Sequence, residues 1–340
     1  MINLFSDTQT KPSAAMRRAM AEAEVGDEQR RQDPTVIKLE EMTAALLGKE
    51  AGLFLPSGTM CNIIAVKAHT QPGDAILADR MSHVLRAELG GAAFHSGATI
   101  DQLAGERGIF TPEQVTEGLK RVSYYSPQVR LVCVENTHNY GGGTIWPLEQ
   151  LRRVCDVAHR AGCATHMDGA RLFNASIASS VSPKDFAAPC DSVWIDLSKG
   201  LGCPVGAVLC GTGEFIVKAR RYKHIFGGAM RQAGIIAAAG VYALEHHIDR
   251  LADDHANARL LAQGLAQIKG FTLDPPEPQT NIVYFDVRGM NTFNYEFIKR
   301  MEERGVSMSP IGELVRAVTH LDVSREDCQR AVDIARKLAS

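Results

Sequence analysis

Apolar and amphipathic segments alternate along the first three-quarters of the chain. Six short segments are apolar almost throughout, as is typical of strands buried on both faces: residues 51–55, 75–78, 130–136, 163–168, 191–198 and 206–211. Helical patterns separate most of them, and we expect helices over 34–47, 59–69, 112–121 and 147–160. This alternation predicts an α/β fold with a mostly parallel sheet between two layers of helices.

Capping residues mark where two of these helices begin and end. Asp33 is suited to the N-cap, Pro34 to the first turn, and Gly48 to the C-terminal end of the 34–47 helix. Thr111 and Gln114 are spaced as a capping box for the helix over 112–121. The helix boundaries therefore rest on hydrogen-bonding chemistry as well as on periodicity.

The pattern changes after residue 232. An alanine-rich helical stretch extends to about 268 and is followed by strand, helix, strand and helix patterns over 280–287, 294–305, 314–322 and 324–338. This order is typical of a small α+β domain. We expect a large domain over residues 1–245, whose N-terminal segment contributes to the functional site, and a small domain over 246–340.

Composition excludes several classes of protein. The 340 residues carry 37 Lys+Arg against 39 Asp+Glu, which argues against nucleic-acid binding. No apolar run approaches the length of a membrane span, and the first residues lack a signal-peptide pattern, so we expect a cytoplasmic protein. The eight cysteines are scattered without a C-x-x-C pair, and no His pair has metal-ligand spacing. We therefore expect buried, reduced thiols and no metal site.

Lys199 is the first candidate for chemistry. It follows an apolar strand and lies in the glycine-rich segment SKGLGCPVG, where glycines let the backbone pass close to a bulky group. A desolvated lysine amine is a nucleophile that forms Schiff bases. The alternative, a solvated surface charge, fits this position poorly.

Asp168 and Arg171 form the second candidate group, in the segment HMDGAR. Asp168 ends a strand and could pair with a protonated pyridine nitrogen, or it could cap a helix. Arg171 could bind a phenolate oxygen or a substrate carboxylate, or it could form a surface ion pair. Each residue taken alone favours the structural alternative.

A phosphate site is predicted where the strand over 51–55 meets the next helix. Ser57, Gly58 and Thr59 lie at this helix N-terminus, whose free N–H groups and dipole attract anions. The chain has neither a P-loop nor a G-x-G-x-x-G fingerprint at this point, so a nucleotide is not expected. Arg231, after a glycine pair, could hold an anion. Phosphate, ring-nitrogen and Schiff-base partners together are what pyridoxal phosphate requires.

Two histidines also follow predicted strands. His83 could stack on a flat cofactor ring, and His138 ends another predicted strand. The remaining candidates, His95, His159, His246, His247 and His255, lie on helical or surface stretches and are expected to be inert.

Read together, the motifs resemble the L-threonine aldolases of the β-eliminating lyase group. The resemblance covers nearly the whole chain in order and rests on LFSDTQTKP, VGDE, GKEAGLFLPSGTMCN, ENTHN, HMDGARLFNA, DLSKGLGCPVGAVL, GGAMRQAGIIAAAGVYAL and VRAVTHLDVS. It implies a fold-type I pyridoxal-phosphate enzyme, with a seven-stranded, mostly parallel sheet and a small C-terminal domain. It also implies a homotetramer built as a dimer of dimers, with active sites shared across the dimer interface.

The resemblance implies a role for each candidate. Lys199 would carry the cofactor, Asp168 would pair with the pyridine nitrogen, and His83 would stack on the ring. The phosphate would be bound by Ser57, Gly58 and Thr59, with Arg231 reaching a neighbouring subunit's cofactor. The substrate α-carboxylate would be held by Ser6, Arg171 and Arg316, with His138 near the β-hydroxyl. The implied reaction is retro-aldol cleavage of an L-β-hydroxy-α-amino acid to glycine and an aldehyde, with His83, His138 or a water as base.

One segment departs from the family pattern. The family commonly reads VGDDVYGEDP where this chain reads VGDEQRRQDP, so Arg30 replaces a tyrosine that faces the active site. We expect Arg30 to contact substrate and to shift the preference away from threonine, toward a polar, acidic or aryl β-substituent. His224 stands where a basic residue such as lysine occurs in relatives.

Two other functions stay open on the sequence. The same scaffold can host β-elimination or side-chain transfer. A non-catalytic binding protein could also keep the fold, although the intact set of Lys199, Asp168 and Arg171 weighs against it.

Overall fold

The centre of the computed structural model, which describes residues 1–120 and 123–339, is a seven-stranded sheet. Its spatial order is β2 (Ala51–Leu55), β8 (Ala207–Gly211), β7 (Ser192–Asp196), β6 (Ala164–Gly169), β5 (Val129–Glu135), β3 (Ala75–Asp79) and β4 (Thr99–Leu103). Only β8 runs antiparallel to its neighbours. The predicted α/β class with a mostly parallel sheet is confirmed.

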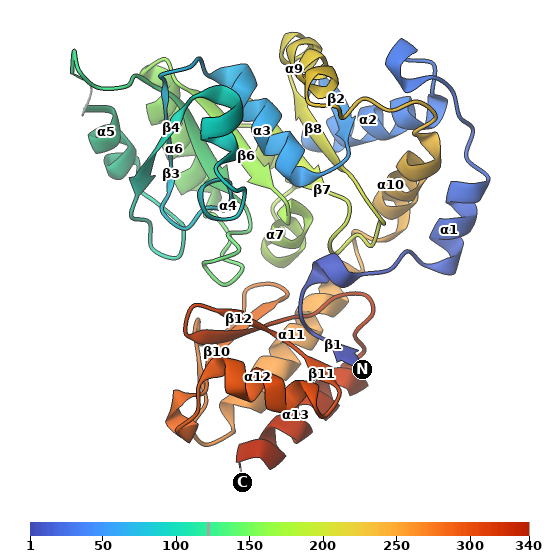
Figure 1. Cartoon of the computed structure of the whole chain (residues 1–340), viewed down its shortest axis with the longest axis vertical. Helices are drawn as coiled ribbons and strands as arrows, with labels where there is room; N and C mark the ends of the chain where they lie inside the picture. The colour runs from blue at the N-terminus through green and yellow to red at the C-terminus, as the bar shows by residue number, and fades with distance from the viewer. Residues whose placement is uncertain (121–122, 340) are drawn as a thin grey trace.

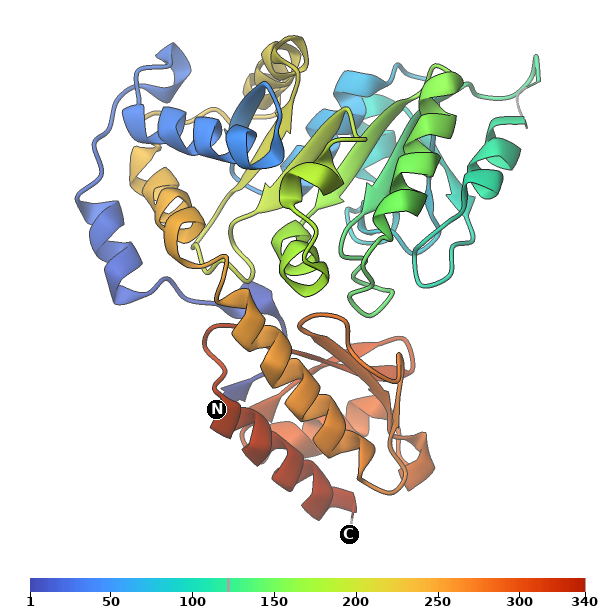
Figure 2. The same cartoon turned by 180° about the vertical axis from the view of Figure 1, so that it is seen from behind.

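Helices cover both faces of this sheet, as the two opposite views show (Figure 1 and Figure 2). α3 and α9 contact one face, and α2 and α6 contact the other, where α8 packs against both of these helices. The helices of this part of the chain are α1 (Ala14–Ala21), α2 (Pro34–Leu47), α3 (Gly58–His69), α4 (His83–Arg86), α5 (Pro112–Lys120), α6 (Leu148–Arg160), α7 (Leu172–Ser179), α8 (Pro183–Ala187), α9 (Gly213–Ile225) and α10 (Gly234–His246). Buried side chains fill the space between the layers on each side.

The predicted caps occur where the sequence places them. Asp33 Oδ1 accepts a hydrogen bond of 3.0 Å from the backbone N–H of Val36, and Gly48 ends α2 at φ 62°. Thr111 and Gln114 form the reciprocal capping box of α5, with N···O distances of 2.8 and 3.2 Å. The predicted last residue of α5, at 121, lies outside the described residues.

A second, smaller layer is built from a four-stranded sheet and three helices. The sheet order is β12 (Ser309–Ile311), β13 (Leu314–Val318), β10 (Ile282–Asp286) and β9 (Thr272–Leu273). The helices are α11 (Leu251–Ala266), α12 (Asn294–Glu302) and α13 (Arg325–Ala339), and α11 lies along α13 (Figure 2). These elements share a separate apolar core, although the domain boundary at 245/246 stays a prediction.

The N-terminal residues belong to this smaller core. β1 (Ile2–Asn3) pairs in parallel with β11 (Val306–Ser307), and Ile2 and Leu4 are buried among the side chains of the small sheet and its helices. The chain then passes to the large sheet (Figure 1). The first ten residues therefore connect the two cores.

The alanine-rich stretch from 232 to 268 was expected to be continuously helical and is not. α10 ends at His246 and α11 begins at Leu251. α10 packs against α2 in the large core, whereas α11 packs against α13 in the small one. The break lies where the chain leaves one core for the other.

Two further expectations concern the whole chain. All eight cysteines are free and buried, as predicted. Among the described residues, no helix is both long and apolar enough to cross a membrane.

Candidate active site

A cavity of about 310 Å³ lies beyond the carboxyl ends of the central strands, where ligands bind in sheets of this kind. It is lined by Pro56, Ser57, Gly58, Thr59, His83, Glu135, Asn139, Asp168, Ala170, Arg171, Trp194, Asp196, Ser198, Lys199, Pro204, Val205 and Gly206. Seven residues predicted from the sequence are among them: Ser57, Gly58, Thr59, His83, Asp168, Arg171 and Lys199. The structure therefore brings most of the predicted site together.

Lys199 lies in the loop that joins β7 to β8. Its side chain is only 15% exposed, and Nζ is 2.9 Å from Asp196 Oδ2 and 5.6 Å from the centre of the Trp194 ring. Gly202 and Gly206 take φ values of 77° and 110°, which L side chains rarely adopt, and so allow the loop to curl around the lysine. The reading of Lys199 as a freely solvated surface charge does not fit this enclosed position.

Asp168 ends β6 as a buried carboxylate. Its Oδ2 accepts a hydrogen bond of 2.9 Å from Asn62 Nδ2, and its Oδ1 accepts one of 3.1 Å from the backbone N–H of Ala170. Burial and the Glu135 carboxylate raise the pKa of Asp168 to about 6, although His83 and Lys199 act in the opposite direction. Arg171, not Asp168, occupies the N-cap position of α7. A cation placed against Asp168 would therefore be strongly attracted.

His83 begins α4, directly after β3, and its side chain is 35% exposed. Nδ1 is 2.9 Å from Glu88 Oε1, and the backbone N–H donates to Glu135 Oε2 at 2.7 Å. Burial lowers the pKa of His83, but the hydrogen bond to Glu88 and the nearby Asp168 and Glu135 carboxylates leave it above its usual value. The imidazole is thus held in one orientation at the wall of the cavity.

Three of these groups could in principle ligate a metal. Atoms of His83, Glu88 and Asp168 lie within 4.8 Å of one another, the one such group in the described part of the chain. His83 and Glu88 are bonded to each other, and Asn62 donates to both Glu88 and Asp168. The expected lack of a metal stays a prediction.

The phosphate turn begins α3. Ser57 Oγ caps the helix by accepting a hydrogen bond of 3.2 Å from the backbone N–H of Met60. A Cβ atom at Gly58 would lie 2.2 Å from the Trp194 ring, so only glycine fits there. Arg231 does not line this cavity within one chain; its side chain is 62% exposed and lies 3.0 Å from Asp27.

The predicted carboxylate-binding arginines differ from each other. Arg171 is buried, and its Nε and Nη2 donate to Asp7 Oδ2 and Oδ1 at 2.7 Å each, so the ion pair is internal and not on the surface. Arg316, on β13, has no ion pair or side-chain hydrogen bond in the described part of the chain, and its Nε is buried. Burial and Arg171 lower the pKa of Arg316, while Tyr284 and Asp7 raise it. Arg316 is therefore a free cation near Asp7 and Arg171, suited to an anionic ligand.

Four other predicted residues lie outside the cavity wall: Arg316, Ser6, Arg30 and His138. Ser6 is buried and its Oγ accepts 3.2 Å from the backbone N–H of Thr8. The Arg30 side chain is 76% exposed, 4.0 Å from Asp27. His138 is 1% exposed, with Nδ1 accepting 3.0 Å from the backbone N–H of Gly141 and Nε2 3.6 Å from Asp79. The structure does not bring His138 to the cavity.

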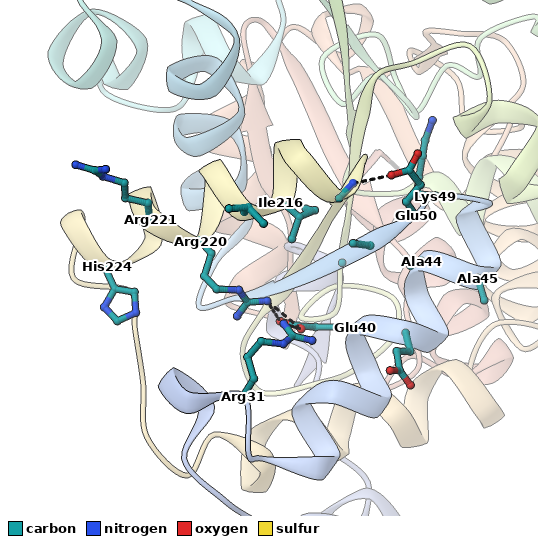
Figure 3. A pocket seen from close by; sticks show the side chains of 15 residues that line it. Arg31, Glu40, Ala44, Ala45, Lys49, Glu50, Ile216, Arg220, Arg221 and His224 are labelled. Carbon is teal, nitrogen blue, oxygen red and sulfur yellow. Dashed lines mark hydrogen bonds and ion pairs between the residues drawn. The ribbon is translucent and has the colours of Figure 1, made fainter.

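A larger cavity of about 810 Å³ lies at the edge strand β2, between α2 and α9 (Figure 3). At its floor Glu40 pairs with Arg31 and Arg220 at 3.2 Å each, while His224 lies at its rim (Figure 3). None of the candidate catalytic or cofactor-binding residues lines it. The volume of a cavity alone therefore does not identify the active site.

Several residues of the site were not anticipated from the sequence. They are Asp7, Asn62, Glu88, Glu135, Trp194 and Asp196. Glu135 and Asp196 end strands, as the predicted residues do, and that signal could have found them. Asp7 and Glu88 carry no such signal.

The residues present fit pyridoxal phosphate. A half-enclosed amine, a buried carboxylate with a raised pKa, an oriented imidazole and a helix N-terminus surround one cavity. These groups match an aldehyde, a pyridine nitrogen, an aromatic ring and a phosphate respectively.

The strand order and the small C-terminal layer are those of fold-type I pyridoxal-phosphate enzymes. The structure is similar to that of a threonine aldolase from Leishmania major, with a TM-score of 0.87, 19% identity and 100% of both chains covered. In sequence, a low-specificity L-threonine aldolase of Arabidopsis thaliana is 39% identical over 96% of this chain and 93% of its own length. The low specificity L-threonine aldolase of Escherichia coli K12 is 39% identical over 96% of each chain.

The family model that describes beta-eliminating lyases matches residues 3–288. The chain belongs to the beta-eliminating lyase family.

Proposed function

We propose that the protein is a pyridoxal-phosphate-dependent lyase that cleaves L-β-hydroxy-α-amino acids to glycine and an aldehyde. L-Threonine, L-allo-threonine and phenylserine are the expected substrate class. The observation that carries this proposal is the convergence of Lys199, Asp168 and His83 on one cavity, in a chain 39% identical to proteins with the name low-specificity L-threonine aldolase.

Four residues in and near the cavity have assigned parts in the proposed reaction. Lys199 Nζ would hold the cofactor, and Asp168 would keep the pyridine nitrogen protonated. When bound, pyridoxal phosphate supplies an electron sink for the electron pair released from the Cα–Cβ bond. Arg316, which has no ion-pair partner among the described residues, would bind the substrate α-carboxylate beside Arg171.

His83 is the base that the geometry favours. Glu88 engages Nδ1 at 2.9 Å and so leaves Nε2 for the substrate. His83 would take the β-hydroxyl proton as the C–O bond becomes the aldehyde carbonyl and the Cα–Cβ bond breaks. A proton delivered to Cα then completes glycine.

The test begins with the purified protein and added pyridoxal phosphate. We expect a yellow colour that borohydride traps on Lys199, followed by aldehyde and glycine from threonine or phenylserine. Lys199→Ala should abolish turnover and leave the fold intact. The control is Lys38→Ala, which replaces an exposed lysine paired with Glu245 and should leave both the turnover and the fold unchanged.

The other outcomes identify the alternatives. Colour with keto acid and ammonia but no aldehyde would indicate β-elimination. A protein that takes up no cofactor, with no adduct at Lys199, would be the non-catalytic binding protein.

We further propose that the protein is cytoplasmic and works as a homotetramer of two tight dimers. Eight free cysteines support a reducing compartment. The exposed side chains of Leu89 and Phe94 and the exposed Arg231 support a second chain close to the cavity. Light scattering should give four times the 36.9 kDa chain mass.

A further inference from the structure

A line of polar side chains, all buried except the half-buried His69, runs behind Asp168. His69 Nε2 lies 2.8 Å from Ser192 Oγ, which lies 2.8 Å from His166 Nδ1. His166 Nε2 is 3.1 Å from Asn62 Oδ1, and Asn62 Nδ2 is 2.9 Å from Asp168 Oδ2. We call His69, Ser192, His166 and Asn62 the buried array. None of the four lines the cavity of Lys199.

The orientation of the Asn62 amide is fixed by its neighbours. The Trp194 indole can only donate, and its Nε1 is 2.7 Å from Asn62, so that Asn62 atom is the oxygen. The amide nitrogen then faces Glu88 Oε1 at 2.6 Å and Asp168 Oδ2 at 2.9 Å, and both carboxylates accept. Asn62 is thus satisfied on every side.

The amide oxygen in turn fixes every proton further along the buried array. His166 Nε2 faces an acceptor and must carry a hydrogen. Burial, with a smaller effect of His69, lowers the pKa of His166 to about 3, so the ring is neutral and Nδ1 accepts.

The Ser192 hydroxyl has one hydrogen, which it donates to His166 Nδ1. His69 Nε2 must therefore donate to Ser192 Oγ. Burial lowers the pKa of His69 to about 4, so this ring is neutral as well. All four hydrogen bonds point toward Asp168.

We propose that the buried array holds Asp168 in its anionic form and so keeps the proton on the pyridine nitrogen; this rests on the proposed function. Donors aligned head to tail polarise one another, and a donor to a carboxylate favours its charged state. This offsets burial and the neighbouring Glu135, which favour the neutral acid. His69, Ser192 and His166 act through Asn62 and are positioning residues.

The first test needs no cofactor. Nitrogen-15 NMR of histidine-labelled protein without pyridoxal phosphate reports which ring nitrogen carries the hydrogen, with His69→Phe and His166→Gln used to assign the signals. At neutral pH we expect hydrogen on Nε2 of both rings. In Ser192→Ala we expect a mixture of tautomers at His69, which loses its acceptor, while His166 keeps its hydrogen on Nε2 against the Asn62 oxygen. Hydrogen on Nδ1 of His166 in the wild type would overturn the proposal.

The second test measures the effect on the loaded enzyme. Ser192→Ala removes both hydrogen bonds of the Ser192 hydroxyl, to His69 and to His166, and should lower kcat about three- to tenfold and leave KM unchanged. The midpoint pH of the change in visible absorbance should rise. When the proton between Asp168 and the pyridine nitrogen lies closer to Asp168, the ring withdraws less electron density from the Lys199 nitrogen, and that nitrogen then keeps its proton to a higher pH.

Controls separate this effect from simple loss of a buried hydroxyl. Ser96→Ala removes a buried hydroxyl that has no hydrogen-bond partner among the described residues, and it should change neither kcat nor the pH midpoint. His69→Phe keeps a ring against Phe215, on which His69 stacks at 4.8 Å, and should shift both values in the same direction as Ser192→Ala. If Ser192→Ala folds poorly, the test is the comparison of kcat and the pH midpoint between His69→Phe and the wild type.

Unchanged kcat and midpoint in Ser192→Ala and His69→Phe would overturn the proposal even with the expected tautomers. A wild-type protein that binds no pyridoxal phosphate would overturn the proposed function and this role together. The tautomer measurement would then still report whether the hydrogen bonds themselves run as assigned.

Discussion

Asp7 and Arg171, which lie 164 residues apart in the sequence, form a buried ion pair through two hydrogen bonds of 2.7 Å each. Asn281 also donates to Asp7 Oδ2, at 3.1 Å. One carboxylate thereby joins the N-terminal segment, the large sheet and the small sheet. Arg171 is already neutralised by Asp7, which leaves Arg316 as the cation available to substrate.

Asp7→Asn should destabilise the protein, because it leaves the Arg171 guanidinium buried without a counter-charge. Breaking a buried pair in this way costs about 3–5 kcal/mol. Denaturant unfolding of the cofactor-free protein measures it. Asp27→Asn, which removes a more exposed carboxylate, is the control and should cost less than about 1 kcal/mol. Equal stability of Asp7→Asn and wild type would contradict the prediction.

Asp168 should make the cofactor-free protein less stable as the pH rises. Its pKa in the folded protein is raised to about 6 from 3.8. The folded state therefore holds this proton more tightly than the unfolded state does, and stability is lost as the pH rises from 3.8 through about 6. Asp168→Asn should remove that loss and gain on the order of 1–2 kcal/mol at neutral pH. Unfolding free energies across this pH range check the sign, and cofactor binding should weaken.

Arg316→Ala should separate binding from stability. Loss of a charge-assisted contact to the substrate carboxylate should lower kcat/KM about 10- to 100-fold, chiefly through KM. Tm should stay the same or rise, because Arg316 has no ion-pair partner to lose within the described residues. Arg288→Ala is the control in the same domain core, just after β10, since Arg288 pairs with Asp286 outside the cavity, and it should leave kcat/KM unchanged.

His83→Phe should keep an aromatic ring at the cavity wall while removing the base. We expect kcat to fall about 10²- to 10⁴-fold with the cofactor still bound. His138→Asn should mainly lower Tm, because His138 is packed between Asp79 and Glu135 and does not itself line the cavity. The reverse pattern, with kcat lost only in His138→Asn, would assign the base to His138.

Arg30→Tyr tests the substrate preference. If Arg30 favours polar, acidic or aryl β-substituents, the tyrosine variant should shift the ratio of kcat/KM values toward threonine by about tenfold. The measurement compares threonine, allo-threonine, phenylserine and 3-hydroxyaspartate. Arg17→Tyr, at an exposed position of α1, controls for the added ring. A wild-type enzyme that prefers threonine by a wide margin would defeat the hypothesis.

The buried strands could be predicted because their apolar residues are consecutive. β4 could not, because its residues Thr99–Leu103 form a largely exposed edge strand with polar side chains. β9 and β11 have two residues each and exist only through pairing with distant strands. The antiparallel direction of β8 follows from the short loop around Lys199, which has no helix to carry the chain back.

The candidate site likewise contains residues whose place could be predicted from the sequence and residues whose place could not. Asp168 and Lys199 follow strands of the sheet, and carboxyl ends of parallel strands meet at one edge, so their convergence could be predicted. His138 follows β5 as well, but its ring turns into its own loop and bonds to Gly141. Asp7 enters from outside the sheet, and only the folded chain brings it to Arg171.

The N-terminal strand has a consequence for how the protein is made. Residues 2–4 hydrogen-bond to residues 305–307, and Thr10 donates to the backbone oxygen of Lys199 at 2.9 Å. During synthesis the first residues leave the ribosome long before their partners at 305–307. The N-terminal segment, whose Thr10 contacts the Lys199 loop, can therefore pair with β11 only after nearly the whole chain has been made.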